Sequence, residues 1–189
     1  QDISKISTQD INEKLRTKTP DYLTVDMPFM PYPDDYSTRK EVEYLKKLAI
    51  ERDEETMEFI NMADRSIGKL FILLLNKNGI YVDDYLKEDI ERVLVETTIP
   101  VLKLKYLYNR ARPYQVADIE GIEFSAIDSE SAKTPSYPSG HATQSMYLAY
   151  YLTKSYPDLS SQLMALGERI AWSRVVAGVH FPSDISFGM

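Results

Sequence analysis

The chain has 189 residues, a formal net charge of −7, two histidines and no cysteine, and 43% of its residues are apolar, enough for one domain with a buried core. The acidic balance argues against a nucleic-acid partner bound through a broad basic surface, and no apolar run approaches the roughly 20 residues that a transmembrane helix needs. Without cysteine there are no disulfides and no cysteine-ligated zinc, and two histidines argue against a histidine-rich metal centre.

Residues 1–36 are predicted to form a separate N-terminal part of the chain. A short polar, amphipathic stretch is followed by a segment rich in proline and tyrosine, and four prolines between Pro20 and Pro33 exclude a continuous helix there. We expect an N-terminal helix and an arm laid over the domain surface, or an arm whose aromatic side chains roof a pocket. The chain begins at Gln1 rather than at Met, which we interpret as a removed signal, a trimmed end or missing residues. The compartment therefore stays open, with a periplasmic or exported location slightly favoured over a cytoplasmic one.

Residues 37–189 are predicted to form a single all-α domain, a helical bundle. Apolar residues recur at helical spacing after a candidate cap at Ser37, and the second helical run ends at Asn78-Gly79, a typical helix stop. The third run contains Pro100, where we expect a bend. No segment alternates with period two. The expected helical stretches are 37–53, 54–79, 82–113, 139–156 and 158–178.

The first of three chemical clusters is "KYLYNRARP". Lys105 and Arg112 are seven residues apart, close to two helical turns, so both side chains should leave one helix in the same direction. Two such cations repel each other unless an anion lies between them. The alternatives are a solvated basic face and the other register, in which Lys103 and Arg110 form the pair.

The second cluster is "PSGH". Pro138 suits the first position of a helix, Ser139 offers a hydroxyl donor, and Gly140 lets a ligand approach the backbone. The exposed N–H groups of a helix start favour an anion, and His141 is placed to give a proton to the group that leaves that anion. The alternative is an ordinary proline-started helix with an incidental histidine.

The third cluster is "SRVVAGVHFPSD". His180 and Asp184 are four residues apart, so the carboxylate can reach an imidazole nitrogen if a helix starts near Pro182. Arg174 would point away from His180 on one unbroken helix, and Gly178 with Pro182 supplies the break that brings both to one site. The alternative is an interhelical turn with a capping aspartate.

Together the clusters indicate one anion site. Three cationic side chains, a helix start and both histidines of the chain fall into three short segments. Burying such cations is costly without a counter-anion, so a bound dianion such as phosphate explains them best.

In this order, K-x6-RP, PSGH and SR-x5-H-x3-D resemble the signature of the type 2 phosphatidic acid phosphatase (PAP2) superfamily, which includes bacterial non-specific acid phosphatases and vanadium-dependent haloperoxidases. The resemblance spans Lys105 to Asp184 and implies the PAP2/haloperoxidase helical fold. The residues that fill the pattern are Lys105, Arg112-Pro113, Pro138-Ser139-Gly140-His141, Ser173-Arg174, His180 and Asp184.

The resemblance implies an acid phosphatase-like hydrolase of phosphomonoesters that needs no metal or other cofactor. His180 would attack phosphorus and form a phosphohistidine while Asp184 holds its far nitrogen, and His141 would protonate the leaving alcohol. We expect a soluble enzyme with a small phosphomonoester substrate, inhibition by vanadate, and a homodimer as a possible assembly. The residues implied to bind the substrate phosphate are Lys105, Arg112, Ser139, the Gly140 N–H and Arg174.

Two other functions stay open. A haloperoxidase would hold vanadate on the nitrogen of His180, but those enzymes resemble a larger scaffold, and only 31 residues separate His141 from Ser173 here. The second alternative is a non-catalytic helical domain that binds phosphate. Two histidines in the motifs argue against it, because binding alone does not need both.

Overall fold

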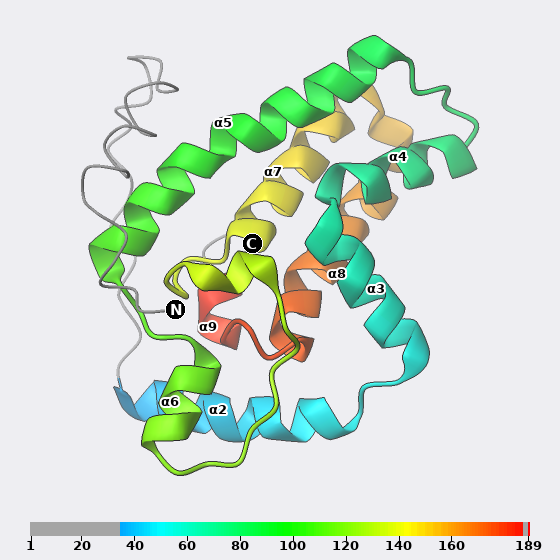
Figure 1. The fold of residues 1–189 in the computed structure, drawn as a ribbon. Coiled ribbons are helices and arrows are strands. Elements are labelled where there is room, and N and C mark those ends of the chain that lie inside the picture. The colour runs from blue at the N-terminus through cyan, green and yellow to red at the C-terminus, as the bar shows by residue number, and fades with distance from the viewer. Residues whose placement is uncertain (1–34, 187–188) are drawn as a thin grey trace.

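The computed structural model describes residues 35–186 and residue 189, and within these residues the chain is helical and has no strand (Figure 1). The expected all-α class is confirmed. The predicted N-terminal helix and arm lie almost wholly outside the described residues. The first described helix, α2, begins at Asp35 rather than at Ser37, because nothing between Pro33 and Ser37 breaks a helix.

The described elements follow one another with short connections, apart from one long loop after α6. The helices are α2 (Asp35–Ile50), α3 (Glu54–Arg65), α4 (Ile67–Lys77), α5 (Asp84–Tyr108), α6 (Pro113–Ile119), α7 (Gly140–Ser155), α8 (Ser160–Val176) and α9 (Pro182–Ile185), with 3₁₀ turns η3 (Glu130–Lys133) and η4 (Pro157–Leu159).

The two expected helical stretches that differ most from the structure are 54–79 and 82–113. The stretch 54–79 is two helices, because Ser66 adopts an extended backbone (φ −163°, ψ 105°), ends α3 and accepts the Lys69 N–H at 3.2 Å as the cap of α4. The stretch 82–113 ends earlier, at Asn109, whose left-handed backbone (φ 48°) closes α5. Pro100 lies inside α5, as expected.

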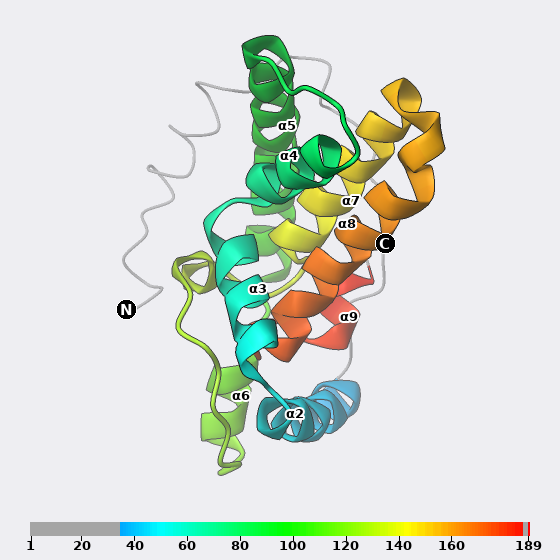
Figure 2. The ribbon, with the colours of Figure 1, turned by 90° about the vertical axis from the view of Figure 1, so that its right-hand side faces the viewer.

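Helices α7 and α8 pack side by side, with α5 across one side of the pair and α3 along another (Figures 1 and 2). One apolar core lies among α3, α4, α5, α7 and α8, and a second joins α2, α6 and α9 to the ends of α7 and α8. No helix in the described part of the chain has the length and apolarity needed to cross a membrane.

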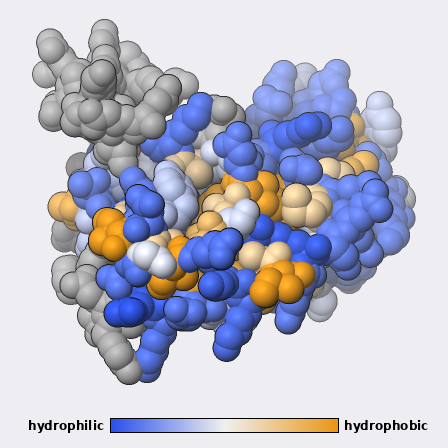
Figure 3. All heavy atoms as spheres, turned by 60° about the horizontal axis from the view of Figure 1, so that its bottom comes forward, coloured by the Kyte–Doolittle hydropathy of each residue, from blue (hydrophilic) through white to orange (hydrophobic). Residues whose placement is uncertain are grey.

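The face on the α2 side is mainly hydrophilic, with apolar side chains in small groups (Figure 3). Tyr44 of α2 and Trp172 of α8 are both about two-fifths exposed, and their ring centroids lie 6.5 Å apart. Scattered exposed apolar residues are normal on protein surfaces, so the homodimer stays a prediction.

The close approach of α7 and α8 depends on Gly167. A Cβ atom at this position would lie 3.0 Å from the sulfur of Met146, 3.1 Å from the carbonyl oxygen of Ser145 and 3.2 Å from the Cβ of Ala149. The Ser145 hydroxyl also donates to the Gly167 carbonyl at 2.9 Å across this contact.

Replacing Gly167 with valine is therefore expected to destabilise the fold by about 1–3 kcal/mol, because the added methyl groups push two helices apart. The free energy of unfolding in urea measures this. Ala165→Val, on the exposed side of the same helix, is the control and should change stability by less than about 1 kcal/mol. Equal effects of the two substitutions would show that helix propensity, rather than packing, is responsible.

Candidate active site

The three sequence clusters meet where α5 and α8 end and α7 begins (Figure 1). A cavity of about 150 Å³ lies there and is lined by Lys105, Gly140, His141 and His180 together with neutral residues of α5, α7 and the loop before α7. Four of the eight residues predicted for the site therefore line the cavity. The other four are each bonded to a residue that lines it, or adjacent to one in the chain: Arg112, Ser139, Arg174 and Asp184.

Lys105 and Arg112 do not leave one helix, so that prediction from their spacing was wrong: α5 ends at Tyr108, and a sharp turn before α6 brings Arg112 back toward Lys105. The left-handed Asn109 donates its N–H to the Lys105 carbonyl at 2.8 Å and ends α5. Arg112 then precedes α6, and its own N–H donates to the Gln115 side chain at 2.8 Å. Pro113 suits the first helical position, where no intrahelical partner for an N–H is needed.

Lys105 is buried, with only 4% of its surface exposed, and its ammonium group donates to two backbone carbonyls. The Nζ atom lies 2.6 Å from the Pro135 oxygen and 3.3 Å from the Ser136 oxygen. Burial, and then the charge of Arg112, hold the pKa of Lys105 well below its usual value, which the charge of Asp184 only partly offsets. A bound anion would stabilise the charged form.

Arg112 is also buried, and its guanidinium is held by two carbonyls of the loop before α7 and by one of the segment between α8 and α9. Nε donates to the Thr134 oxygen at 2.8 Å, Nη2 to the Ser131 oxygen at 3.1 Å, and Nη1 to the Val179 oxygen at 2.6 Å. Burial lowers the pKa of Arg112 to about 10, so it remains charged at neutral pH. Nη1 also lies 3.0 Å from Nε2 of His180.

Two contacts fix the tautomer of His180: Nε2 faces Arg112, and Nδ1 faces Asp184. A guanidinium only donates, so Nε2 must accept and carries the lone pair. The other nitrogen, Nδ1, lies 3.2 Å from Oδ2 of Asp184 and therefore carries the proton. Burial, and then the charge of Arg112, hold the pKa of His180 well below its usual value, so the ring is neutral. A neutral ring with Nε2 unprotonated is what a nucleophile requires.

Asp184 is fully buried and accepts hydrogen bonds on both oxygens. Oδ2 accepts from the Ser136 hydroxyl at 2.5 Å and from the Phe181 N–H at 2.8 Å, and Oδ1 accepts from Nη1 of Arg110 at 2.5 Å. Burial raises the pKa of this carboxyl group, but the hydrogen bond of His180, the charge of Arg110 and the hydrogen bond of Ser136 outweigh burial and hold the pKa well below its usual value. Asp184 is therefore ionised.

Arg110 is a residue whose role the sequence did not predict. It is 2% exposed and also forms an ion pair with Glu41 of α2, with Nη2 and Oε2 3.0 Å apart. Lys103, its partner in the alternative register, is exposed, whereas Lys105 lines the cavity and Arg112 contacts His180. The sequence offered one signal for Arg110, the closely spaced arginines of "RAR". Both of these arginines are buried in the structure.

The PSGH segment starts α7 one step later than expected. Ser139 is the N-cap and accepts the Ala142 N–H at 3.4 Å, so the helix begins at Gly140, and Pro138 precedes the cap instead of occupying the first helical position. The hydroxyl of Ser139 accepts this bond and keeps its own proton to donate. Together with the N–H groups of the first turn, it gives the helix start the donors that an oxyanion needs.

His141 lies in the first turn of α7, and its side chain is 12% exposed. Its Nε2 atom is 4.0 Å from Oδ1 of Asp64, a residue of α3. Burial lowers the pKa of His141 to about 3, the charge of Arg174 adds to this, and the charge of Asp64 opposes it. Both imidazoles are thus neutral without a bound anion.

Arg174 is fully buried at the end of α8, and the nitrogens of its guanidinium differ in whether they form hydrogen bonds. Its Nη2 atom donates to Asp64 at 2.7 Å, to the Ser129 hydroxyl at 2.9 Å and to the Ser131 hydroxyl at 3.3 Å. Its Nε and Nη1 atoms are buried and have no hydrogen-bond partner among the described residues. A buried guanidinium with two open donors is a site for an oxyanion.

Sequence reasoning missed Asp64 and the two serines. Asp64 follows the buried Ala63 and lies four residues after the buried Ile60, so it is at the edge of the core-facing side of α3. A carboxylate on an apolar helix face was the signal that could have found it. In the described residues no group of three or more histidine, aspartate or glutamate side chains could hold a metal ion.

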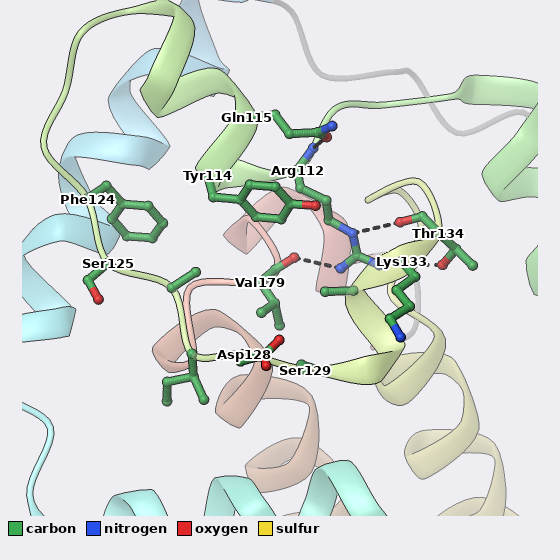
Figure 4. A pocket seen from close by; sticks show the side chains of 13 residues that line it. Arg112, Tyr114, Gln115, Phe124, Ser125, Asp128, Ser129, Lys133, Thr134 and Val179 are labelled. Atoms are coloured by element: carbon green, nitrogen blue, oxygen red, sulfur yellow. Dashed lines mark hydrogen bonds between the residues drawn. The ribbon is translucent and has the colours of Figure 1, made fainter. Parts of the chain in front are cut away.

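A second cavity of about 490 Å³ lies beside Arg112 (Figure 4). Figure 4 shows the Arg112 guanidinium bonded to the carbonyls of Val179 and Thr134, with the Tyr114 ring nearby and the Phe124 segment forming the far wall. Although larger, this cavity is lined by neither histidine. We therefore assign the chemistry to the 150 Å³ cavity.

The comparisons with known proteins agree with these motifs. The PAP2 superfamily profile matches residues 93–189. An acid phosphatase of Zymomonas mobilis is 32% identical over 100 residues, which cover 52% of this chain and 37% of that protein. A non-specific acid phosphatase of Salmonella typhi is 32% identical over 84 residues, 44% of this chain and 33% of that protein. The matched segment thus spans only about a third of each curated relative.

Two solved structures share the fold. A transmembrane PAP2-type phosphatidylglycerolphosphate phosphatase from Bacillus subtilis is 20% identical, with a TM-score of 0.53 over 82% of this chain and 80% of that one. A bacterial vanadium-dependent iodoperoxidase is 16% identical, with a TM-score of 0.61 over 89% of this chain and 50% of that one. At these identities the likeness concerns the fold alone.

Proposed function

The chain belongs to the PAP2 superfamily, as its three motifs predicted, and on that premise we propose that it is a phosphatase that hydrolyses phosphomonoesters through a phosphohistidine. The observation that carries the proposal is the unprotonated Nε2 of His180, which lines the same cavity as Lys105 and His141 and contacts Arg112. A nucleophile surrounded by donors for three phosphate oxygens fits phosphoryl transfer.

In the first step, Nε2 of His180 attacks phosphorus, an N–P bond forms and the P–O bond to the alcohol breaks. His141 gives its proton to the leaving oxygen. As the ring becomes positively charged, the Nδ1–H bond to Asp184 stabilises it. The N–H of Arg112 that now points at Nε2 must turn to a phosphate oxygen for this attack.

In the second step, His141 takes a proton from water and the hydroxide attacks phosphorus. The N–P bond breaks, its electron pair returns to Nε2 of His180, and inorganic phosphate leaves. The donors proposed to hold the phosphate oxygens in both steps are Lys105, Arg112, Ser139, the Gly140 N–H and Arg174. The proposal requires no cofactor.

The wall of the cavity beside His141 supports a substrate with a neutral leaving group. Thr98, Val101 and Leu102 of α5 and Gln144 of α7 form this wall, and all four are uncharged. We infer a water-soluble phosphomonoester, with the phosphate bound among the cations and the alcohol against α5. A lipid phosphate, such as the substrate named for the structural relative from Bacillus subtilis, is the competing source of the same headgroup chemistry.

A haloperoxidase is the second candidate, because the iodoperoxidase shares the fold over most of this chain. The haloperoxidases that the motifs resemble are expected to have a larger scaffold between the second and third motifs. Here only the 3₁₀ turn η4 lies between α7 and α8, which argues against that activity.

Assays with p-nitrophenyl phosphate, a detergent-dispersed phosphatidic acid and iodide with vanadate and peroxide separate these functions. We expect hydrolysis of p-nitrophenyl phosphate that survives chelation and is inhibited by vanadate, whose trigonal-bipyramidal form resembles the transition state. Preferential hydrolysis of the lipid would contradict the water-soluble substrate. Iodide oxidation without any hydrolysis would overturn the phosphatase.

The variant His141→Ala is expected to accumulate the covalent intermediate. With an activated ester such as p-nitrophenyl phosphate, the leaving group needs little protonation, so phosphorylation of His180 should proceed while hydrolysis of the intermediate slows by about 10²–10⁴-fold. Acid quenching and mass spectrometry of the intact protein measure the bound phosphate. The double variant with His180→Ala is the matched control and should carry none; phosphate bound to it would contradict the covalent route.

A further inference from the structure

Asp64 is an acidic side chain inside a site whose other ionic groups are mainly cationic. It comes from α3, outside the segment that matches the PAP2 profile. A carboxylate near a bound phosphate dianion repels it, so its presence needs an explanation beyond phosphate binding. The two groups that it faces, Arg174 and His141, provide one.

The first contact orients a guanidinium. Oδ1 of Asp64 accepts from Nη2 of Arg174 at 2.7 Å, and the Ser129 hydroxyl, which donates to the same oxygen at 2.7 Å, also accepts from Nη2. Every hydrogen bond that the Arg174 guanidinium makes to the described residues is made by this one nitrogen. The two open nitrogens, Nε and Nη1, are therefore held in a fixed direction without being occupied.

The second contact concerns the charge around His141. The ionic groups that influence this imidazole are Arg174 from α8, Lys105 from α5 and Asp64 from α3, and His180 lines the same cavity. Asp64 is the only one of these that favours a protonated His141, and its Oδ1 lies 4.0 Å from Nε2. Burial raises the pKa of Asp64, but the Ser129 hydrogen bond, the charge of Arg174 and the Ser131 hydrogen bond outweigh it, so the carboxylate stays ionised.

We propose that Asp64 is a positioning residue with two tasks: it aims the open nitrogens of Arg174 at the phosphate, and it supplies the negative charge against which His141 holds the proton for the leaving group. The inference rests on the proposed phosphatase function and adds to it a residue of α3 that acts through two others. It also explains why an acid is retained where phosphate must bind.

The test separates the charge of Asp64 from its hydrogen bond. Asp64→Asn removes the charge but keeps an acceptor for Arg174, whereas Asp64→Ala removes both. Asp64→Glu keeps the charge. Glu58→Gln, at an exposed position on the same helix, is the control that removes one negative charge remote from the cavity. Circular dichroism verifies that each variant is folded.

The first readout is the pH profile of kcat for glycerol 2-phosphate, an alkyl ester whose leaving alcohol, unlike p-nitrophenol, needs the proton of His141. His141 must be protonated in the substrate complex, so the alkaline limb follows its pKa. We expect this limb to move to lower pH by about one unit in both Asp64→Asn and Asp64→Ala, because a nearby opposite charge favours the protonated imidazole by that order. Asp64→Glu and Glu58→Gln should leave the limb in place.

The second readout does not require turnover. The chain has two histidines, so the Cε1–H signals in an NMR titration with bound inorganic phosphate can be assigned by comparison with His180→Ala. The His141 signal should titrate about one unit lower in Asp64→Asn than in the wild type. Phosphate affinity should be retained in Asp64→Asn and fall about tenfold in Asp64→Ala, because only the latter releases Arg174.

An unchanged alkaline limb and an unchanged His141 titration in Asp64→Asn would overturn the proposal. So would equal phosphate affinity in the Asn and Ala variants, because Arg174 would then need no aiming. If the wild type fails to hydrolyse any phosphomonoester, the proposed function is wrong, while the NMR and affinity measurements with inorganic phosphate still decide the role of Asp64. If Asp64→Asn does not fold, the pH profile and the NMR titration of His141 are measured on Asp64→Ala instead, with the same expected shift.

Discussion

The variant His180→Ala is expected to lower kcat for p-nitrophenyl phosphate by about 10⁴-fold or more, which makes it the largest effect on activity that we predict. Removing the imidazole removes the atom that forms the covalent bond, and no other described side chain that lines the 150 Å³ cavity carries an unprotonated nitrogen in contact with Arg112. Steady-state kinetics measure the loss. Binding of inorganic phosphate, followed by calorimetry, should survive, because Lys105 and Arg174 do not depend on the ring.

The fold should also survive this substitution. Asp184 keeps three other donors, namely Arg110, Ser136 and the Phe181 N–H, so no buried charge is left unpaired. Added imidazole is expected to restore part of the activity, since it can occupy the space of the missing ring and attack phosphorus itself. Activity within tenfold of the wild type would show that His180 is not the nucleophile.

The variant Arg110→Ala is expected to cost about 3–5 kcal/mol of unfolding free energy, the largest stability effect that we predict. The guanidinium lies between two carboxylates, 2.5 Å from Asp184 and 3.0 Å from Glu41, and its side chain is 2% exposed. Removing it leaves two carboxylates without their cation in a nearly dry environment. Chemical denaturation at neutral pH measures the loss.

A surface arginine provides the matched control. Arg92 also pairs with two carboxylates, Asp89 and Glu96, but its side chain is 50% exposed. Arg92→Ala is therefore expected to cost less than about 1 kcal/mol, because exposed ion pairs contribute little. Similar losses at both positions would contradict the importance that we give to burial.

The cost of Arg110→Ala should also depend on pH. The folded protein holds the pKa of Asp184 below its usual value, so the stability from this carboxylate is present above about pH 4, its value in an unfolded chain, and is lost as the pH falls through the lowered pKa. Without Arg110 that pKa is depressed less. The difference between wild type and variant should therefore be largest near neutral pH and shrink in acid.

The proposed site residues could be identified from sequence because the three motifs lie in short segments, and the structure brings these segments together around one cavity. His180 and Asp184 are four residues apart, so local structure nearly fixes that pair. Lys105 and Arg112 instead meet through the turn after α5, which their seven-residue spacing did not predict. The break at Gly178 was also predicted, because glycine readily adopts a left-handed backbone; its φ is 76°. The fold class followed from helical periodicity and was confirmed.

What could not be predicted depends on contacts between distant segments. The bonds from Asp64 to Arg174 and from Glu41 to Arg110 join residues 110 and 69 positions apart, and nothing in the local pattern of either partner specifies the other. Helix ends were missed where a single side chain decides them. Ser66 splits one run into two, and the Ser139 cap places Pro138 before α7 rather than in its first turn.

The ion pairs to α2 and α3 determine what the smallest working unit of this protein must contain. The profile match covers residues 93–189, yet Glu41 and Asp64, which hold one arginine each, lie on the other side of that boundary. A fragment cut at residue 93 would keep every motif residue but expose the apolar faces that α3 and α4 cover on α7 and α8. The motif residues alone are therefore not enough to build this site, because α2 and α3 supply the carboxylates that pair with two of its arginines.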